Sequence, residues 1–211
     1  MKVEHRNGTI EYYHRYVIAS IVHPNKPIGI LLDFEPCTRT DGQKKQDSEI
    51  NQAKRLLERL HLQVKGLWDI VLLDALFCSH PILDTIKDRY TKDYIVVFKN
   101  KRVHAYNEII ALLANEPEII SETEKEIIVA KKTSNLIPDI HYLSHSVLPV
   151  EAKITNIKKK TRSDWLWISS FDHQHLFTII KTARRRWQGE EFYNLFEYQH
   201  HWFLQSKSVP L

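Results

Sequence analysis

The sequence is poor in glycine and cysteine, with five Gly and two Cys among 211 residues. Two cysteines, Cys37 and Cys78, are too few for a disulfide-bonded scaffold and are typical of a reducing compartment. No apolar run approaches the roughly 20 residues of a membrane-spanning helix, and the first six residues do not resemble a signal peptide. These absences predict a soluble, cytoplasmic protein without a membrane partner.

Hydrophobic residues make up 43% of the chain, which is enough for a folded core in one domain with or without an insertion. The formal net charge of +4 is distributed unevenly. Residues 152–187 contain nine basic residues and two acids, whereas residues 100–151 contain eight acids and five bases. The basic segment is a candidate contact surface for a polyanion, although a solvated charged face gives the same pattern.

The first hundred residues alternate between strand and helix patterns. Aromatic and β-branched residues dominate 11–22 and 28–34, on either side of a turn signal, which predicts a β-hairpin. Asp47 is placed to cap an amphipathic helix, and strands are predicted at 68–74 and 94–98 with a helix between them. Because strands joined by helical crossovers are normally parallel, we predict an α/β fold.

The pattern changes after residue 99. Residues 100–162 contain short β-like runs such as 127–130 and no clear helical period after residue 113, so we interpret them as a β-rich insertion. A strand at 165–168 follows, and Asp172 is placed to cap the next helix. A last helix is expected around residues 192–203.

Two acids stand at positions suited to metal binding. Asp74 closes the apolar run at 68–74, and Glu190 follows a basic helix end at 184–186. Mg²⁺ prefers oxygen ligands, usually a few carboxylates together with water and substrate phosphate. The pair is therefore typical of a two-metal nuclease site, which normally needs a third acid. Taken alone, Asp74 also fits a turn or capping role, and Glu190 a solvated helix surface.

The combination of these segments resembles the DDE transposases of bacterial insertion sequences, whose catalytic domain has an RNase H-like fold. The likeness spans nearly the whole chain. Residues 5–14 and 21–24 are similar to the family's second strand, and residues 33–36, 41–49 and 53–57 to its next strand and first helix. VLLDALF (71–77) and DYIVVFK (93–99) are similar to the family's strand that bears the second acid and to the strand that follows it. WISS (167–170) and RRWQGE (185–190) are similar to the strand and helix that bear the third acid.

This resemblance implies roles for five residues. Asp74 and Glu190 would be the second and third metal-binding acids, while Lys99, Arg185 and Arg186 would lie near the DNA backbone. Mg²⁺ or Mn²⁺ would activate a water or a 3′-hydroxyl for in-line attack at phosphorus. The family further implies transposon-end DNA and a second copy of the chain as partners.

The same resemblance implies a domain plan. Residues 1–99 and 163–211 would form an RNase H-like mixed sheet with its flanking helices, and residues 100–162 would be inserted before the last catalytic helix. The family's first acid lies on an opening strand, upstream of the part that residues 5–14 resemble. We therefore expect the first strand and first acid to be missing and Mg²⁺ to bind weakly. Asp33 or Glu35 would have to substitute from a different strand.

Two functions stay open at this point. The first is a transposase that cuts and joins DNA, and the second is a non-catalytic remnant that binds DNA or an intact transposase. The twelve histidines also raise the possibility of a zinc site, for example through His141 and His145, or through His200 and His201 with one of the cysteines. None of these spacings is typical of a zinc motif.

Overall fold

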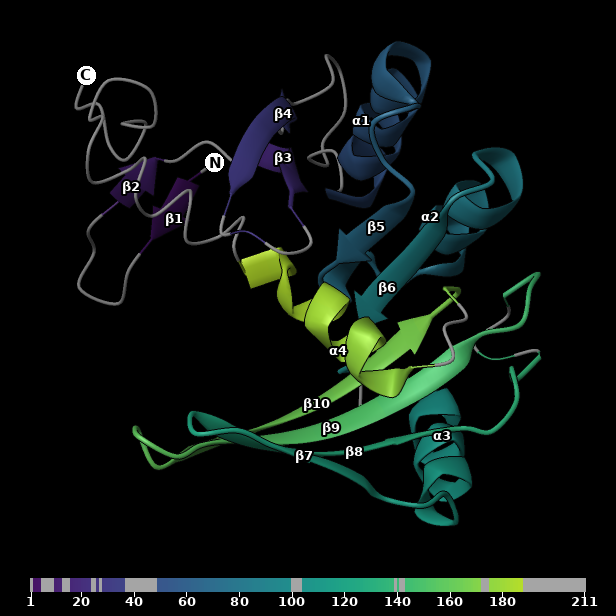
Figure 1. Cartoon of the computed structure of the whole chain (residues 1–211). Helices are drawn as coiled ribbons and strands as arrows, with labels where there is room; N and C mark the ends of the chain where they lie inside the picture. The colour runs from purple at the N-terminus through teal and green to yellow at the C-terminus, as the bar shows by residue number, and fades with distance from the viewer. Residues whose placement is uncertain are drawn as a thin grey trace. The chain divides into compact units, whose positions relative to one another are not determined.

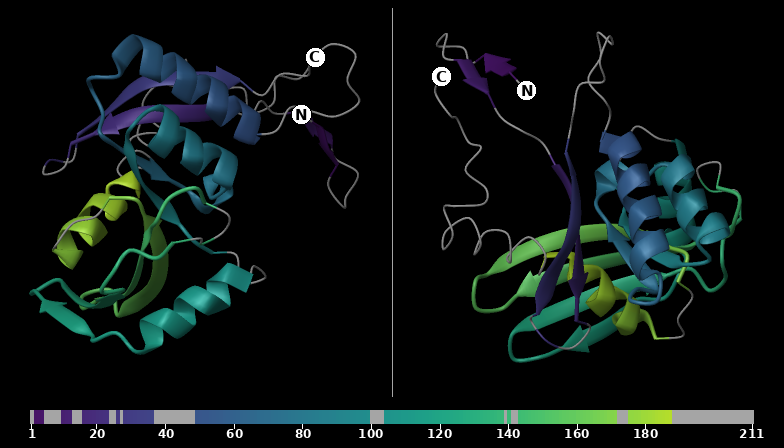
Figure 2. Two further views of the ribbon diagram at one scale, coloured as in Figure 1. Left: turned by 90° about the vertical axis from the view of Figure 1, so that its right-hand side faces the viewer. Right: turned by 90° about the horizontal axis from the view of Figure 1, so that it is seen from above.

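The computed structural model describes residues 2–4, 10–12, 16–23, 26, 28–36, 49–99, 104–138, 140, 143–171 and 175–187. The chain divides into two compact units, Met1–Lys65 with Arg185–Leu211, and Gly66–Arg184. Figure 1 labels the elements of both units, and Figure 2 gives two further views. Each unit is described by itself below.

The first unit contains two antiparallel strand pairs and one long helix. Strand β1 (Lys2–Glu4) pairs with β2 (Ile10–Tyr12), and β3 (Tyr16–Val22) pairs with β4 (Gly29–Pro36). Helix α1 (Glu49–Val64) contacts both strands of the second pair. The predicted hairpin is confirmed, with its first strand beginning at Tyr16. The predicted cap of α1, Asp47, lies outside the described residues.

The second unit is built on a mixed six-stranded sheet with the strand order β5-β6-β10-β9-β8-β7. Only β5 and β6 are parallel, and every other neighbouring pair is antiparallel. The sheet confirms the predicted α/β class and the predicted parallel crossover. Its strands are β5 (Ile70–Leu73), β6 (Asp93–Val97), β7 (Ile119–Glu122), β8 (Glu126–Lys132), β9 (Leu148–Asn156) and β10 (Thr161–Ser169).

Helices cover both faces of this sheet. The crossover from β5 to β6 contains η1 (Ala75–Phe77), α2 (His80–Asp84) and η2 (Thr85–Arg89), a π-helical turn that continues α2. Helices α3 (His104–Ala114) and α4 (Leu176–Arg184) lie on opposite faces in Figure 1. No helix among the described residues is long and apolar enough to cross a membrane.

The expected insertion supplies part of the same sheet. Residues 100–162 contain α3 together with β7, β8 and β9, and β9 pairs along all nine of its residues with β10. The strand predicted at 165–168 is therefore longer, because the ladder with β9 extends it back to Thr161. The expected cap Asp172 and the last helix around 192–203 lie outside the described residues.

The core is centred on β6. All residues from Tyr94 to Phe98 are buried, which places both faces of this strand away from water. Ile95 and Val97 belong to the apolar cluster that includes Leu176, Ile179 and Ile180 of α4. A strand covered on both faces shows a continuous apolar run instead of an alternating one, as VVF does here.

Substitution of two isoleucines, one buried and one exposed, tests whether the buried core supplies the stability of this unit. Ile168 of β10 is fully buried opposite Val96, whereas Ile120 of the outer strand β7 is 62% exposed. We expect Ile168→Ala to lower the free energy of unfolding by about 2–5 kcal/mol, because it leaves a cavity. The matched control Ile120→Ala should cost less than about 1 kcal/mol. Urea denaturation followed by circular dichroism measures both, and equal losses would contradict the assignment of this core.

Candidate functional site

Asp74 directly follows β5, at the carboxyl end of the parallel strand pair. The residue is exposed and precedes η1, but its side chain makes no capping hydrogen bond there. Its neighbour β6 runs in the same direction and leads to Lys99, so Asp74 and Lys99 lie at the same end of the sheet. Ligand sites in α/β proteins commonly occupy this end of parallel strands.

The resemblance also implied roles for one further acid and three cations. Glu190 lies outside the described residues. Lys99 is exposed, with its ammonium 5.2 Å from the centre of the Trp165 ring. Arg185 and Arg186 are partly buried, and the Arg186 guanidinium lies 5.8 Å from the centre of the Trp187 ring. Lys99 is thus the most accessible of the three expected DNA contacts.

Arg184 begins the same basic run but is already paired. Its two terminal nitrogens donate to both carboxylate oxygens of Glu126, at 2.7 and 2.9 Å. A two-point arginine–carboxylate pair of this kind is strong and fixed in direction. The ion pair between Arg184 and Glu126 therefore connects α4 to β8.

Asp33 and Glu35, the possible substitutes for a first acid, are held by arginines of α1. The Nε atom of Arg59 donates to Asp33 at 2.7 Å, its Nη1 donates to Glu35, and Nε of Arg55 donates to Glu35 at 2.7 Å. The bond from Arg59 lowers the pKa of Asp33 despite partial burial. Burial opposes ionisation of Glu35, but the two arginines together still lower its pKa. Both carboxylates are therefore engaged in holding α1 to β4.

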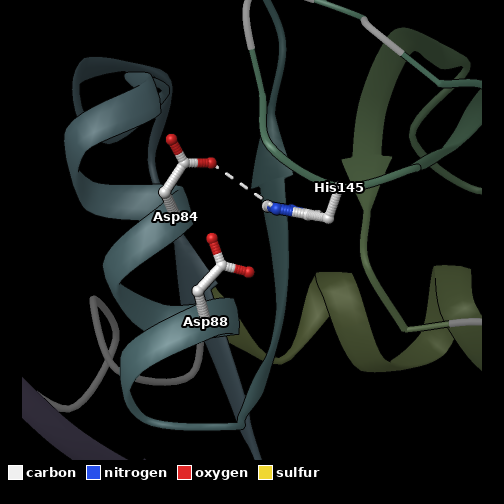
Figure 3. A group of neighbouring side chains, drawn as sticks. All are labelled: Asp84, Asp88 and His145. Carbon is white, nitrogen blue, oxygen red and sulfur yellow. Dashed lines mark ion pairs between the residues drawn. The ribbon is translucent and has the colours of Figure 1, made fainter.

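A second acidic site, which the sequence did not predict, lies beside the crossover helix (Figure 3). Asp84 ends α2, Asp88 lies in η2, and His145 comes from the loop before β9. One ligand atom from each of the three residues lies within 4.8 Å of the other two, so the group could hold a metal ion. Nδ1 of His145 lies 3.5 Å from Oδ1 of Asp84.

Tyr94 orients the imidazole of His145 from the core side. The Tyr94 hydroxyl lies 2.7 Å from Nε2 of His145, and the two rings meet edge to face. Burial lowers the pKa of His145, although Asp88 and Asp84 oppose this shift. Burial also raises the pKa of Tyr94. Burial therefore favours the neutral form of the imidazole in this site.

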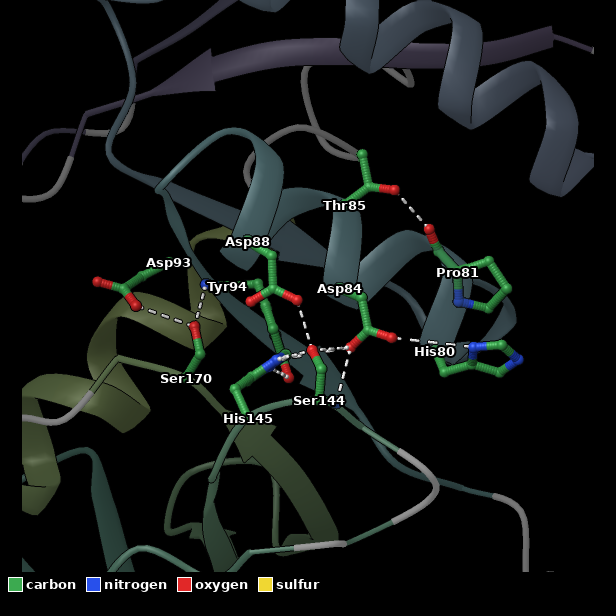
Figure 4. A network of polar contacts seen from close by, with 10 residues as sticks. All are labelled: His80, Pro81, Asp84, Thr85, Asp88, Asp93, Tyr94, Ser144, His145 and Ser170. Carbon is green, nitrogen blue, oxygen red and sulfur yellow. Dashed lines mark hydrogen bonds and ion pairs between the residues drawn. The ribbon is translucent and has the colours of Figure 1, made fainter.

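Ser144 connects the two carboxylates (Figure 4). Its backbone N–H donates to Asp84 at 3.2 Å, and its hydroxyl lies within hydrogen-bonding distance of both Asp84 and Asp88. A hydroxyl has one proton, so it donates to one carboxylate at a time. The nearby Lys87 ammonium is bonded to Asp93 at 2.7 Å.

Of the three residues in this site, only the two aspartates have a spacing in the sequence that places them together. Asp84 and Asp88 are four residues apart on a predicted helix, where side chains share a face. The sequence raises His145 only as a possible zinc ligand together with His141, which lies outside the described residues. Folding instead places His145 opposite a helix about 60 residues earlier. Cys78 is a poor thiolate ligand, since burial raises its pKa to about 12.

Comparison of the sequence with models of protein families finds no match, and neither does comparison with curated proteins.

The ion pairs between α1 and β4 give a pH prediction. The pKa values of Asp33 and Glu35 are lowered on folding, so their contribution is complete at neutral pH and is lost as the pH falls below about 4. We expect Arg59→Gln to cost up to about 1 kcal/mol at pH 7, because solvent screens these partly exposed ion pairs, and progressively less toward pH 3. Thermal melts from pH 3 to 7 measure this difference. Lys54→Gln on the same helix is the control, and a loss in Arg59→Gln that does not change with pH would contradict the prediction.

Proposed function

We propose that this protein is a DDE transposase-like, DNA-binding protein in which Asp74 holds Mg²⁺ or Mn²⁺ against a DNA phosphate. The observation that carries the proposal is the position of Asp74, an exposed and uncapped carboxylate at the end of a parallel strand, at the same end of the sheet as the exposed Lys99. A carboxylate-bound cation there would offset the charge of a phosphodiester, and Lys99 would add to this effect.

The mixed sheet is compatible with the RNase H-like fold that belongs to this proposal. The strand carrying Asp74 is parallel to the next strand along the chain, and α2 with η2 forms the crossover between them. Helix α4 leads toward the basic segment 184–186 and then to Glu190, the second proposed metal ligand. Transposition of DNA, by cleavage and transfer of strands, is the reaction that belongs to such a pair of acids.

An exposed basic turn supports DNA as the ligand. Lys158, Lys159 and Lys160 form the turn between β9 and β10, and Arg162 follows on β10. All four side chains are exposed, and Arg162 pairs with Asp164 at 2.9 Å. The charge of Arg184 is taken up by Glu126. A two-stranded ribbon with lysines at its tip has the size and charge to follow a DNA groove.

A non-catalytic, DNA-binding protein is the second candidate. A two-metal site needs a third carboxylate, and the two acids closest to that role by sequence, Asp33 and Glu35, are paired with Arg59 and Arg55. Occupied carboxylates of this kind would have to break their ion pairs before binding a metal. A protein limited to binding DNA, or to pairing with an intact transposase, needs no such rearrangement.

The basic turn gives a prediction for DNA affinity. Replacing Lys158, Lys159 and Lys160 together by Gln should weaken binding to duplex DNA and reduce the slope of log K against log salt by up to about three. The control replaces Lys131 and Arg184 by Gln, because their charges are paired with Glu118 and Glu126. Fluorescence anisotropy at several salt concentrations compares the proteins. Equal salt slopes for all of them would remove the turn from the DNA contact.

The strand-end acid gives a prediction for activity. If the chain is catalytic, Mg²⁺-dependent nicking or strand transfer should fall at least about 100-fold in Asp74→Asn and in Glu190→Gln, because each change removes a metal-binding carboxylate. DNA affinity without metal should stay within about twofold. Cleavage of labelled duplex DNA with and without Mg²⁺ measures the first quantity. Salt-dependent binding without cleavage in the unaltered protein selects the non-catalytic candidate, and absence of both rejects the proposal.

A further inference from the structure

We propose that Asp84, Asp88 and His145 bind one divalent transition-metal ion, at a site separate from Asp74. This inference does not depend on the proposed function. The three side chains come from two segments far apart in the sequence and point toward one another (Figure 3). One imidazole, two carboxylates and a water form a donor set suited to Zn²⁺ or Mn²⁺. Ca²⁺ and Mg²⁺, in contrast, take oxygen ligands.

The helical side of the site is fixed by its buried face. Ile82, Leu83 and Ile86 are completely buried, and the two aspartates lie on the part of the helix that they leave uncovered. The π-helical turn between the aspartates is closed by the N–H of Tyr90, which donates to the carbonyl of Thr85 at 3.1 Å. Both carboxylates therefore start from backbone positions that the core holds in place.

The loop that carries His145 is anchored by buried residues before and after the histidine. Leu143 and Val147 are buried, and Val147 exchanges backbone hydrogen bonds with Ile137 at 2.7 and 2.9 Å. His145 lies between these two anchors with 11% of its side chain exposed. A ligand placed on a short, anchored loop loses little conformational entropy when it binds.

The imidazole nitrogen that faces the acids makes only long polar contacts among the described residues. Nδ1 of His145 lies 3.4 Å from the hydroxyl of Ser144 and 3.5 Å from Asp84. Both separations exceed those of ordinary N–H···O hydrogen bonds, about 2.7–3.2 Å. Nε2, by contrast, lies 2.7 Å from the Tyr94 hydroxyl. Metal-binding histidines commonly have such an outer partner, which fixes the ring and directs its other nitrogen toward the ion.

The local charge also favours a cation. Among the described residues, Asp84 pairs only with the imidazoles of His80 and His145, and Asp88 forms no ion pair. The nearest lysine, Lys87, is bonded to Asp93. The two acidic side chains therefore meet the imidazole without a lysine or arginine partner among the described residues.

The spacing requires only a small adjustment. Ligand atoms bound to one ion at about 2.0–2.2 Å lie at most about 4.4 Å apart. The three ligand atoms now lie within 4.8 Å of one another. The difference of about 0.4 Å is small compared with the distance that a carboxylate oxygen moves when an aspartate side chain rotates. Ser144 would then keep its hydrogen bond to one carboxylate as part of the surrounding shell.

Zinc titration of the metal-free protein tests the site. Isothermal titration calorimetry with ZnCl₂ at pH 7 should show binding at a site that the double variant Asp84→Asn/Asp88→Asn lacks, with at least a tenfold loss of affinity. The double variant Asp69→Asn/Asp164→Asn removes two exposed carboxylates that belong to neither proposed metal site, so it is the control and should leave this binding unchanged. Circular dichroism of the double variant checks that it is folded.

A measurement on the unaltered protein covers the case in which that variant does not fold. Long-range ¹H–¹⁵N correlation spectra, with His145→Gln used for assignment, should show the Nδ1 signal of His145 shifting on addition of one equivalent of Zn²⁺. Thermal stability should rise with Zn²⁺ concentration, as expected for a ligand that binds the folded state. Zinc binding of equal affinity in the folded double variant, or an unchanged His145 signal at 1 mM Zn²⁺, overturns the inference.

Discussion

The organisation of the second unit depends on the burial of β6. This strand forms the only parallel pair of the sheet with β5 on one side and an antiparallel pair with β10 on the other. Each of its edges is hydrogen-bonded, and each of its faces is covered. The position of Asp74 at the end of β5 and that of Lys99 after β6 both follow from this pairing. The hydroxyl of Tyr94, also on β6, reaches His145.

Polar contacts at the start of β6 connect it further to β10. The hydroxyl of Ser170 accepts from the N–H of Tyr94 at 3.0 Å and donates to Asp93 at 2.9 Å, and the N–H of Ser170 donates to the carbonyl of Tyr94. Buried polar groups are costly unless they are hydrogen-bonded. These bonds therefore fix the register of β6 against the end of β10, next to the residues that surround His145.

The charged residues divide into those that hold elements together and those that remain accessible. Arg59 and Arg184 are each bonded to carboxylates of a neighbouring strand. Lys99 and the lysines at 158–160 are exposed at the end of the sheet and in the β9–β10 turn. Net charge alone cannot separate these groups, because affinity for DNA depends on the cations that are free to displace counterions.

Sequence patterns determined much of the fold because they report local periodicity and burial. The apolar run that ends at Asp74, the amphipathic face of α1 and the continuous run in β6 each predicted the correct element. The pattern at 165–168 missed the first residues of β10, since Thr161 to Asp164 are exposed and become a strand only through pairing with β9. The full length of β10 is therefore determined by its pairing with β9, which is a tertiary contact.

The two candidate metal sites also differ in how far local sequence patterns predict them. A carboxylate at the end of a strand can be predicted from sequence, because the strand and its end are both local features. The group of Asp84, Asp88 and His145 could not, because no spacing along the chain indicates which loop will face a given helix. His145 lies opposite the two aspartates because Ile82 and Ile86 are buried on the helix and Leu143 and Val147 are buried in the loop. The sequence by itself thus determined the elements and the acid at the end of β5, and only tertiary packing brought the histidine to the two aspartates.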